Sequence, residues 1–497
     1  MAQKYILAID QGTTSSRAIL FNPNAEIIAQ KNFEFTQIYP RPGWVEHNPE
    51  EIWQTVLKAF QYIIDESGIK YQDIDSIGIT NQRETTVIWD RKTGKPIHNA
   101  IVWQCRRTAD RCNKIKESIY NSIIYDKTGL VTDPYFCATK IEYILSNVEN
   151  AQKSAEKGDL CFGTIESWLI YKLTAGKHHV SDYSNASRTM LLNIHTLDWD
   201  SELLEYFNIP ISMMPQLISN SANNIFADPS YFGGHKIPIS GVVGDQQGAL
   251  FGQACFNKGD VKNTYGTGCF LLMNIGKKPR KSNNRLLTTI AWHINNEVTY
   301  AMEGAVFIGG AVIQWLRDGL GIIDNSSKTS DIAKSNTKES VLFVPAFTGL
   351  GSPYWDPDVR GSILGITRDT TRDDIVKAAL EGIAYQTADL YESMKSDFGG
   401  KIGDFKADGG ASKNEYLMQF QSNIIQNRVF ASDMNETTAL GAAFFAGLAT
   451  GFFPSIDYIK GLKRTFTSYD PLINKLQSDN LYHRWKKGVE SVVSFKN

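Results

Sequence analysis

The sequence lacks the features that mark membrane, secreted and nucleic-acid-binding proteins. Its 51 basic and 53 acidic residues leave a formal charge of −2, which gives no electrostatic reason to expect nucleic acid or an anionic membrane as a partner. The longest apolar stretch, residues 439–453, carries three glycines. It is shorter than the roughly 20 residues that cross a bilayer, so we expect a buried helix and no membrane span. The apolar run after Lys4 ends at Asp10, too soon for the core of a signal peptide.

Paired cysteines and linkers are also missing. The six cysteines are scattered without a Cys-x-x-Cys pair, which favours free thiols in a reducing cytosol and predicts a cytoplasmic protein. No short-period repeat and no proline-rich linker interrupts the chain. Its 497 residues exceed one hydrophobic core, so two or three domains are expected from a typical size of roughly 150 residues each.

The most informative segment that is present runs from Ile6 to Arg17. An uncharged apolar run ends at Asp10, and a carboxylate at the end of a strand can hold a hydrated Mg²⁺ ion. A turn at Gly12 follows, where backbone N–H groups and hydroxyls can bind phosphate oxygens. No lysine follows the glycine at the spacing of a P-loop, and an ordinary hairpin with a polar turn is the alternative. The candidate phosphate ligands are Thr13, Thr14, Ser15 and Arg17.

Two later glycine turns resemble the first. Residues 265–269 read Tyr-Gly-Thr-Gly-Cys between expected strands at 260–264 and 270–274. A third candidate is an expected strand at 405–408 that ends in Gly409-Gly410 before a helical run over 413–426, and such a turn points free N–H groups at a ligand. Three turns at domain-sized intervals predict a duplicated α/β architecture with a nucleotide in the cleft between its halves.

A coarse secondary structure can be assigned around these turns. Residues 5–9, 18–21 and 27–35 have the pattern of a β-meander. Asn48-Pro49-Glu50-Glu51 predicts a helix start with an asparagine cap. Residues 74–79 form a further expected strand, with 81–84 in the loop after it. Residues 180–199 show little periodicity and are interpreted as an insertion on the first domain.

Longer motifs carry a family resemblance that runs from about Tyr5 to about Trp485. They are Gly-Ile-Thr-Asn-Gln-Arg-Glu-Thr-Thr-Val at 78–87, Trp-Gln-Cys-Arg-Arg-Thr at 103–108, Gly-Asp-Gln-Gln at 244–247, Asn-Thr-Tyr-Gly-Thr-Gly-Cys-Phe at 263–270, and Pro-Ala-Phe-Thr-Gly-Leu-Gly-Ser-Pro-Tyr-Trp-Asp at 345–356. With these motifs the chain resembles the FGGY carbohydrate kinases of the actin–hexokinase superfamily. Residues 361–381 are similar to the family's second signature, and the first signature begins at Tyr135 with Tyr143 where tryptophan is usual.

The resemblance implies a fold and a reaction. The expected fold is α/β, with two duplicated ribonuclease-H-like domains of the actin/hexokinase type at 1–252 and 253–497 and a nucleotide cleft between them. The expected reaction is ATP-dependent phosphorylation of glycerol to sn-glycerol 3-phosphate, with Mg²⁺ as the cofactor. A homodimer or homotetramer is also expected. Hinged closure of the two domains over the small-molecule substrates is expected separately, because closure excludes water.

The resemblance also assigns roles to individual residues. Asp245 is the expected general base, because phosphoryl transfer needs an oriented hydroxyl and an acceptor for its proton. Asp10, together with Asp245, would orient the metal ion, either as a direct ligand or through water. The expected glycerol-binding residues are Arg83, Glu84, Trp103, Tyr135, Asp245, Gln246 and Phe270. The expected ATP-binding residues are Thr13, Thr14, Ser15, Arg17, Thr267, Gly310, Gln314, Gly410 and Asn414.

Other functions stay open at this point. One is a kinase for another polyol or a ketose such as xylulose, although the Arg83–Glu84 pair and Phe270 favour a smaller substrate. Another is an ATP-driven actin- or chaperone-like protein that uses the same cleft without a sugar. Regulation is undecided, because residues 232–236 resemble a loop that binds fructose 1,6-bisphosphate in some relatives but carry Lys236 in place of arginine, which does not bind phosphate as a fork. Tyr231 stands where other relatives are phosphorylated on histidine.

Overall fold

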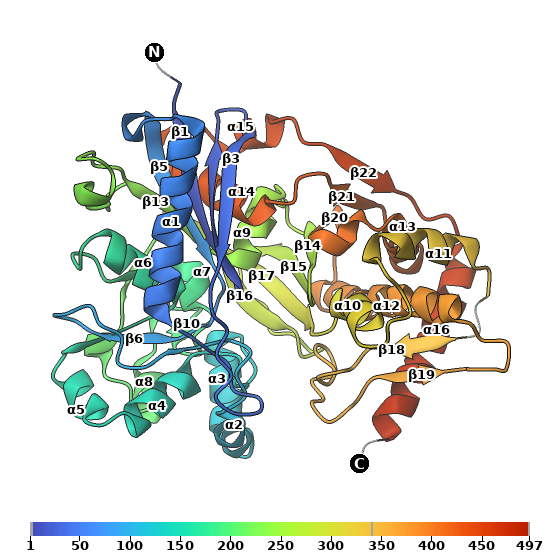
Figure 1. The fold of residues 1–497 in the computed structure, drawn as a ribbon. Coiled ribbons are helices and arrows are strands. Elements are labelled where there is room, and N and C mark those ends of the chain that lie inside the picture. The colour runs from blue at the N-terminus through green and yellow to red at the C-terminus, as the bar shows by residue number, and fades with distance from the viewer. Residues whose placement is uncertain (1–2, 339–340, 496–497) are drawn as a thin grey trace.

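The computed structural model describes residues 3–338 and 341–495. Two α/β halves, each built on its own mixed sheet, lie side by side with helices between them and on their outer faces (Figure 1). The N-terminus belongs to the first half and the C-terminus to the second. In the described parts of the chain no helix combines the length and the apolar character that a membrane span needs. All six cysteines are buried and unpaired, as the sequence predicts.

The first sheet contains five strands in the order β13-β5-β1-β2-β3. The three N-terminal strands are antiparallel neighbours, which confirms the predicted meander, and β5 and β13 run parallel to β1. Their bounds are β1 Tyr5–Gln11, β2 Ser15–Phe21, β3 Ile27–Glu34, β5 Ile74–Asn81 and β13 Ile239–Gly244.

The second sheet repeats this topology. Its order is β16-β17-β15-β14-β20-β21-β22, so β17-β15-β14-β20-β21 matches β3-β2-β1-β5-β13 strand for strand. Within it β14, β15 and β17 are antiparallel neighbours, and β20 and β21 run parallel to β14. The bounds are β14 Val261–Tyr265, β15 Cys269–Gly276, β16 Leu287–Ile294, β17 Glu297–Val306, β20 Phe405–Asp408, β21 Val429–Ser432 and β22 Phe466–Tyr469. The equivalent order confirms the duplicated α/β fold.

Helices bury the apolar faces of these sheets. The first half is covered by α1, Pro49–Ser67, whose cap Asn48 accepts a hydrogen bond from the Glu50 backbone N–H as predicted. The second half packs around α12, Arg372–Phe398, most of whose side chains are buried. The predicted buried helix at 439–453 is α14, Thr437–Thr450.

Two helices form the middle of the molecule. α9, Asp245–Gly252, follows the last strand of the first sheet, and α14 follows β21 of the second and packs against β5 and β13 of the first. Their backbones approach so closely that a Cβ added to Gly441 would lie 1.9 Å from the Gly248 carbonyl oxygen. Glycine at this crossing therefore sets the distance between the halves.

The remaining elements surround these two sheets. In the first half they are β4 Glu46–His47, β6 Val87–Asp90, β7 Ala100–Ile101, α2 Ala109–Lys116, α3 Tyr120–Thr128, α4 Ala138–Asn147, α5 Ala151–Glu156, β8 Leu160–Gly163, α6 Ile165–Leu173, β9 Val180–Asp182, α7 Tyr183–Ala186, β10 Leu192–Asn193, β11 Asp198–Trp199, α8 Ser201–Tyr206 and β12 Gln216–Ile218. In the second they are α10 Ala311–Asp318, α11 Thr329–Ser335, β18 Leu342–Val344, β19 Ser362–Leu364, α13 Glu415–Ile425, α15 Ile456–Gly461 and α16 Lys475–Ser494.

Two local expectations need correction. Asn81 is the last residue of β5 rather than part of the following loop, because its backbone still pairs with Gln11 of β1 and Gly244 of β13. The helix after Gly409-Gly410 begins at Glu415, since a 3-10 turn over 410–413 comes first. Residues 180–199 contain the short elements β9, α7, β10 and β11, and much of this stretch is buried beside the two sheets.

Candidate active site

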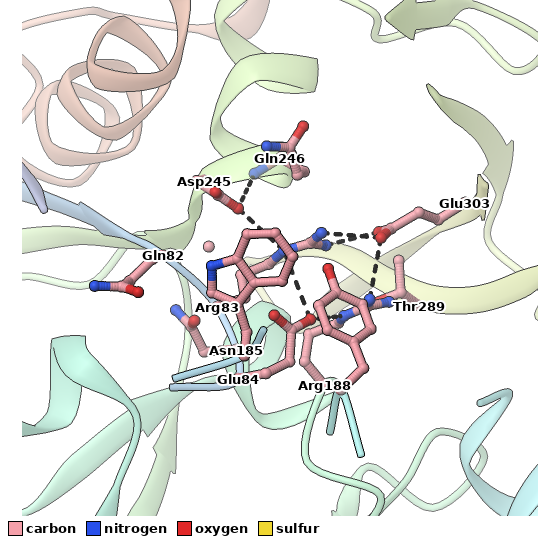
Figure 2. A network of polar contacts seen from close by, with 12 residues as sticks. Gln82, Arg83, Glu84, Asn185, Arg188, Asp245, Gln246, Thr289 and Glu303 are labelled. Carbon is pink, nitrogen blue, oxygen red and sulfur yellow. Dashed lines mark hydrogen bonds and ion pairs between the residues drawn. The ribbon is translucent and has the colours of Figure 1, made fainter. Parts of the chain in front are cut away.

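Arg83 lies at the centre of a buried ion-pair network where the two halves meet (Figure 2). It follows the end of β5 and is 2 % exposed. Its Nε lies 3.0 Å from Asp245 Oδ1 of the first half, and its Nη1 and Nη2 donate to the two carboxylate oxygens of Glu303 at 2.6 and 2.9 Å. Glu303 belongs to β17 of the second sheet, so this arginine fixes a carboxylate from each half.

A second arginine completes the network. Arg188 Nε donates to Glu84 Oε1 at 2.6 Å, and its Nη2 donates to Glu303 Oε1 at 3.0 Å. Burial raises the pKa of Glu84, and Arg188 and Arg83 oppose that shift without cancelling it. Burial also tends to raise the pKa of Glu303. There the positive charges of Arg188 and Arg83 outweigh burial, and the pKa of Glu303 lies below its ordinary value. Two carboxylates and two guanidinium groups thus balance one another's charge away from solvent, and Arg188 Nη1 is left without a hydrogen-bond partner among the described residues.

Asp245 and Gln246 begin α9, directly after the last strand of the first sheet. The side chain of Asp245 is 31 % exposed, so one carboxylate in this network is open to a ligand while Arg83 holds it. The Gln246 backbone N–H donates to Asp245 Oδ1 at 2.7 Å, and the Gln246 side-chain oxygen accepts from Lys262 Nζ at 2.6 Å. Burial lowers the pKa of Lys262, and the carboxylates of Asp408, Asp245 and Glu303 counteract that effect.

Three aromatic side chains meet next to this network. The ring of Trp103 packs edge-on against Tyr135 and Phe270, with centroids 5.6 and 6.2 Å apart. Trp103 Nε1 also donates to Thr13 Oγ1 at 3.1 Å, which ties the aromatic cluster to the first glycine turn. The structure therefore brings together the seven predicted glycerol-binding residues and one predicted phosphate ligand.

The first hairpin contains the carboxylate predicted to act on a metal ion. Burial raises the pKa of Asp10 to about 7; Arg17 opposes this, while Glu436 and Asp245 add to it. Arg17 forms an ion pair with Glu436, which precedes α14. The hydroxyls of Thr14 and Ser15 have no hydrogen-bond partner among the described residues, so both are available to a ligand.

The residues predicted to hold the nucleotide line one cavity of about 590 Å³ in the second half. Gly310 N donates to Gly266 O at 2.8 Å, which closes the second glycine turn against the start of α10. Asn414 caps α13 through its side chain. The predicted residues on the wall are Thr267, Gly310, Gln314, Gly410 and Asn414. Thr13, Thr14, Ser15 and Arg17 are absent from that wall and belong to the hairpin of the first half.

Several residues of the site were missed from the sequence. Arg188 lies in the stretch interpreted as an insertion, Glu303 lies in a strand without a recognised motif, and Lys262 directly precedes the motif at 263–270. The available signal was a single charged side chain at a buried position of a strand, Lys262 in β14 and Glu303 in β17. Ser326, Ser327 and Thr329 also line the cavity and were not predicted.

The donor set around Asp10 fits a hydrated cation rather than a caged one. In the described part of the chain no group of three or more His, Cys, Asp or Glu side chains is arranged to hold a metal ion. Mg²⁺ commonly uses one or two carboxylates together with water and substrate phosphates. Asp10, a desolvated carboxylate beside a phosphate-type turn, suits that mode of binding.

Two features outside this network, Tyr143 and the loop at 232–236, can be described by their packing and backbone conformation. Tyr143 packs edge-on against Trp44 at 5.8 Å, and the Arg107 guanidinium lies over its ring, so the aromatic replacement in the first signature serves packing. Gly233 and Gly234 have φ of 57° and 88°, and His235 beside them is exposed. Ligand binding at residues 232–236 stays a prediction.

Comparison with known proteins agrees with this geometry. Residues 5–252 match the N-terminal domain of the FGGY family of carbohydrate kinases, and residues 261–450 match its C-terminal domain. The fold and the site thus define a carbohydrate kinase, and the chain belongs to the FGGY family. It is 55% identical over 494 residues to glycerol kinase 2 of Thermotoga maritima, which covers 99% of both chains. It is 51% identical to glycerol kinase of a Geobacillus strain, over 99% of this chain and 100% of the relative.

Solved structures give the same result. The crystal structure of Plasmodium falciparum glycerol kinase with ADP superposes with a TM-score of 0.93 at 37% identity, covering 99% of this chain and 98% of the other. A gluconate kinase from Lactobacillus acidophilus superposes with a TM-score of 0.89 at 22% identity, which supports the fold alone.

Proposed function

We propose that this protein is an ATP-dependent glycerol kinase that forms sn-glycerol 3-phosphate. The observation that carries the proposal is the contact of Arg83 with Asp245, placed beside Glu84 and the aromatic group of Trp103, Tyr135 and Phe270. A three-carbon polyol has hydroxyls for the charged groups and C–H edges for the rings. Relatives that are half identical over the full chain and are named glycerol kinase support the same substrate.

Asp245 is the proposed general base. Its partly exposed carboxylate can accept the proton of a terminal hydroxyl as that oxygen attacks the γ-phosphorus of ATP in line. Arg83, held by Glu303, orients the Asp245 carboxylate and donates to glycerol. Glu84, held by Arg188, accepts from a second hydroxyl, and Gln246 binds a further one.

The two glycine turns are proposed to hold the phosphates. Thr13, Thr14, Ser15 and Arg17 supply donors from the first half, and Thr267 supplies one from the second. Gly310, Gln314, Gly410 and Asn414 would bind the remainder of ATP in the cavity of the second half. Mg²⁺ held by Asp10, and by Asp245 through water, would neutralise charge on the phosphates.

The arrangement of the chain beyond the site is also a proposal. We place the domain boundary between residues 252 and 253, after α9, and expect a cytoplasmic homodimer or homotetramer. Size-exclusion chromatography with light scattering tests the assembly against the 55.6 kDa chain mass.

Closure of the two halves over both substrates would exclude water and limit ATP hydrolysis. Small-angle scattering with and without glycerol and a non-hydrolysable ATP analogue tests it, and an unchanged profile would contradict closure.

A substrate panel tests the proposed function. ATP turnover is measured with glycerol, glyceraldehyde, dihydroxyacetone, erythritol, xylulose and gluconate, each over a range of concentrations. Glycerol should give the highest kcat/KM. Greater turnover with xylulose or gluconate would move the protein to another kinase activity, and ATPase activity independent of any polyol would favour the actin- or chaperone-like alternative.

A further inference from the structure

Lys262 and Gln246 join the two halves directly beside Asp245. Lys262 lies on β14 of the second sheet with a side chain that is 0 % exposed. Its Nζ donates to Gln246 Oε1 at 2.6 Å and reaches the Phe270 carbonyl oxygen at 3.5 Å. Gln246 follows Asp245 in α9, and Phe270 is one of the aromatic residues around Trp103. The ammonium group therefore touches two residues of the proposed glycerol site without itself being predicted there.

The contact between Lys262 and Gln246 fixes the orientation of the Gln246 side-chain amide. An ammonium group has three donors and no acceptor, so only the carbonyl end of the Gln246 side chain can face it favourably. In the flipped orientation the amide NH₂ would oppose the ammonium, donor against donor. Gln246 Nε2 is thereby directed away from Lys262, and among the described residues none accepts a hydrogen bond from it.

Burial shifts the pKa of Lys262 downward, and nearby carboxylates oppose that shift by stabilising the ammonium form. Carboxylates from both halves, Asp408, Asp245 and Glu303, act favourably on the ammonium group, against its burial and the repulsion of Arg83. Gln246 as a residue is 7 % exposed, but its Nε2 keeps some solvent access, so this donor is open to a ligand. A substrate hydroxyl oxygen is the partner that the proposed reaction supplies.

We propose that Lys262 is a positioning residue that locks the Gln246 amide so that Nε2 donates to a hydroxyl oxygen of the polyol. The inference rests on the proposed function, because it needs a hydroxylated substrate beside Asp245. Lys262 contributes no atom to the reaction. By fixing the amide, Lys262 makes the site favour substrates that carry a hydroxyl oxygen opposite Gln246 Nε2. An analogue without that oxygen would leave the directed donor unpaired.

A double-mutant cycle tests the proposal. Wild type, Lys262→Met, Gln246→Leu and the double variant are assayed for kcat and KM with glycerol. Lys262→Met should raise the KM for glycerol roughly 3- to 10-fold, the size of one lost hydrogen bond, with a smaller effect on kcat. In the Gln246→Leu background the same change should alter KM less than about twofold, because the amide through which Lys262 acts is gone. Circular dichroism and thermal unfolding verify that each variant is folded.

Two results would overturn the proposal. One is an equal fold-change in KM for Lys262→Met in both backgrounds, which would make Lys262 a general structural residue. The other is a Lys262→Met variant that lowers kcat without changing KM, both in wild type and in the Gln246→Leu background. That result would mean that Lys262 acts on the charge of Asp245 and not through the Gln246 amide. Should Lys262→Met not fold, Lys262→Gln replaces it in the same cycle under the same criterion. Absence of glycerol phosphorylation by wild type would instead defeat the proposed function, and it is seen before any variant is compared.

Discussion

Asp10 and Arg17 are directly paired residues of β1 and β2, on the two sides of the turn at Gly12. Antiparallel pairing thus places a half-buried carboxylate and a guanidinium group together at the end of the first hairpin, where the turn offers hydroxyls and N–H groups. Arg17 is also bound by Glu436 at the start of α14. The phosphate-type turn of the first half is therefore tied to the helix that links it to the second half.

Replacing the proposed base should abolish most of the activity while the fold survives. Asp245→Asn removes the proton acceptor and the ion pair with Arg83, so kcat should fall by about 10²- to 10⁴-fold. Steady-state kinetics with glycerol and ATP measure it. Asp457→Asn is the matched control, because its side chain is 89 % exposed and far more accessible to solvent. A variant at Asp245 with full kcat would refute its role as the base.

Glu303→Gln should destabilise the protein strongly. Glu303 is the shared partner of Arg83 and Arg188, so its neutralisation leaves two buried guanidinium groups undercompensated. We expect a loss of about 3–5 kcal/mol in the free energy of unfolding. Denaturant titration measures the loss.

A control for Glu303→Gln lies on the same strand. Glu297 pairs with Lys277, and both side chains are more than half exposed, so Glu297→Gln should change stability by no more than about 1 kcal/mol. Similar losses for the two variants would mean that the buried network contributes no more than a surface pair.

The free energy of unfolding should fall in mild acid because His47 is buried. Burial lowers the pKa of His47 from 6.5 to about 4, so the folded protein keeps the ring neutral where the unfolded chain would protonate it. A depressed folded pKa contributes stability that is fully present above pH 6.5 and is lost progressively as pH falls from about 6.5 to about 4. Between pH 7 and pH 5 the wild type should lose about 2 kcal/mol that a His47→Gln variant does not lose.

Unfolding titrations at both pH values measure this difference for wild type, His47→Gln and His235→Gln. His235 is exposed, so its removal is the control and should leave the loss between the two pH values as in wild type. An equal loss in the wild type and His47→Gln would show that the imidazole is not desolvated in solution.

Gly441→Ala should disturb the crossing of α9 and α14. The new methyl would lie 1.9 Å from the Gly248 carbonyl oxygen, so the helices must separate, at a cost of about 1–3 kcal/mol or more. Thermal unfolding measures that cost, and glycerol turnover shows whether the separation also moves Asp245. Gly461→Ala is the control, since a Cβ there meets nothing within 4 Å. Equal unfolding temperatures for the two variants would contradict the close crossing.

Much of the fold could be predicted because patterns among neighbouring residues indicate it. The meander, the Asn48-capped helix and the buried helix at 439–453 each follow from a run of neighbouring residues with a clear period or cap. The repeat of a strand, a glycine turn and a strand at 260–274 predicted the duplication. The start of α13 was placed too early, because a glycine pair signals a turn but not the 3-10 geometry that follows it.

The charged partners of the site could not be predicted from such patterns. Arg83, Glu84 and Asp245 stand in recognisable motifs, but Arg188 reaches Glu84 from 104 residues away in sequence and Glu303 reaches Arg83 from 220 residues away. Lys262 is a single charge in a short strand. Which distant charges neutralise one another depends on how the two sheets are placed, and no local periodicity records that.

The most direct test of the account identifies the product of the wild-type reaction. The protein is incubated with ATP, Mg²⁺ and glycerol, and the phosphorus-containing products are followed by ³¹P nuclear magnetic resonance. The account predicts that the γ-phosphate appears on a terminal glycerol oxygen, in step with ADP. Formation of ADP with free phosphate only, or no turnover with glycerol while another sugar is phosphorylated, would contradict it.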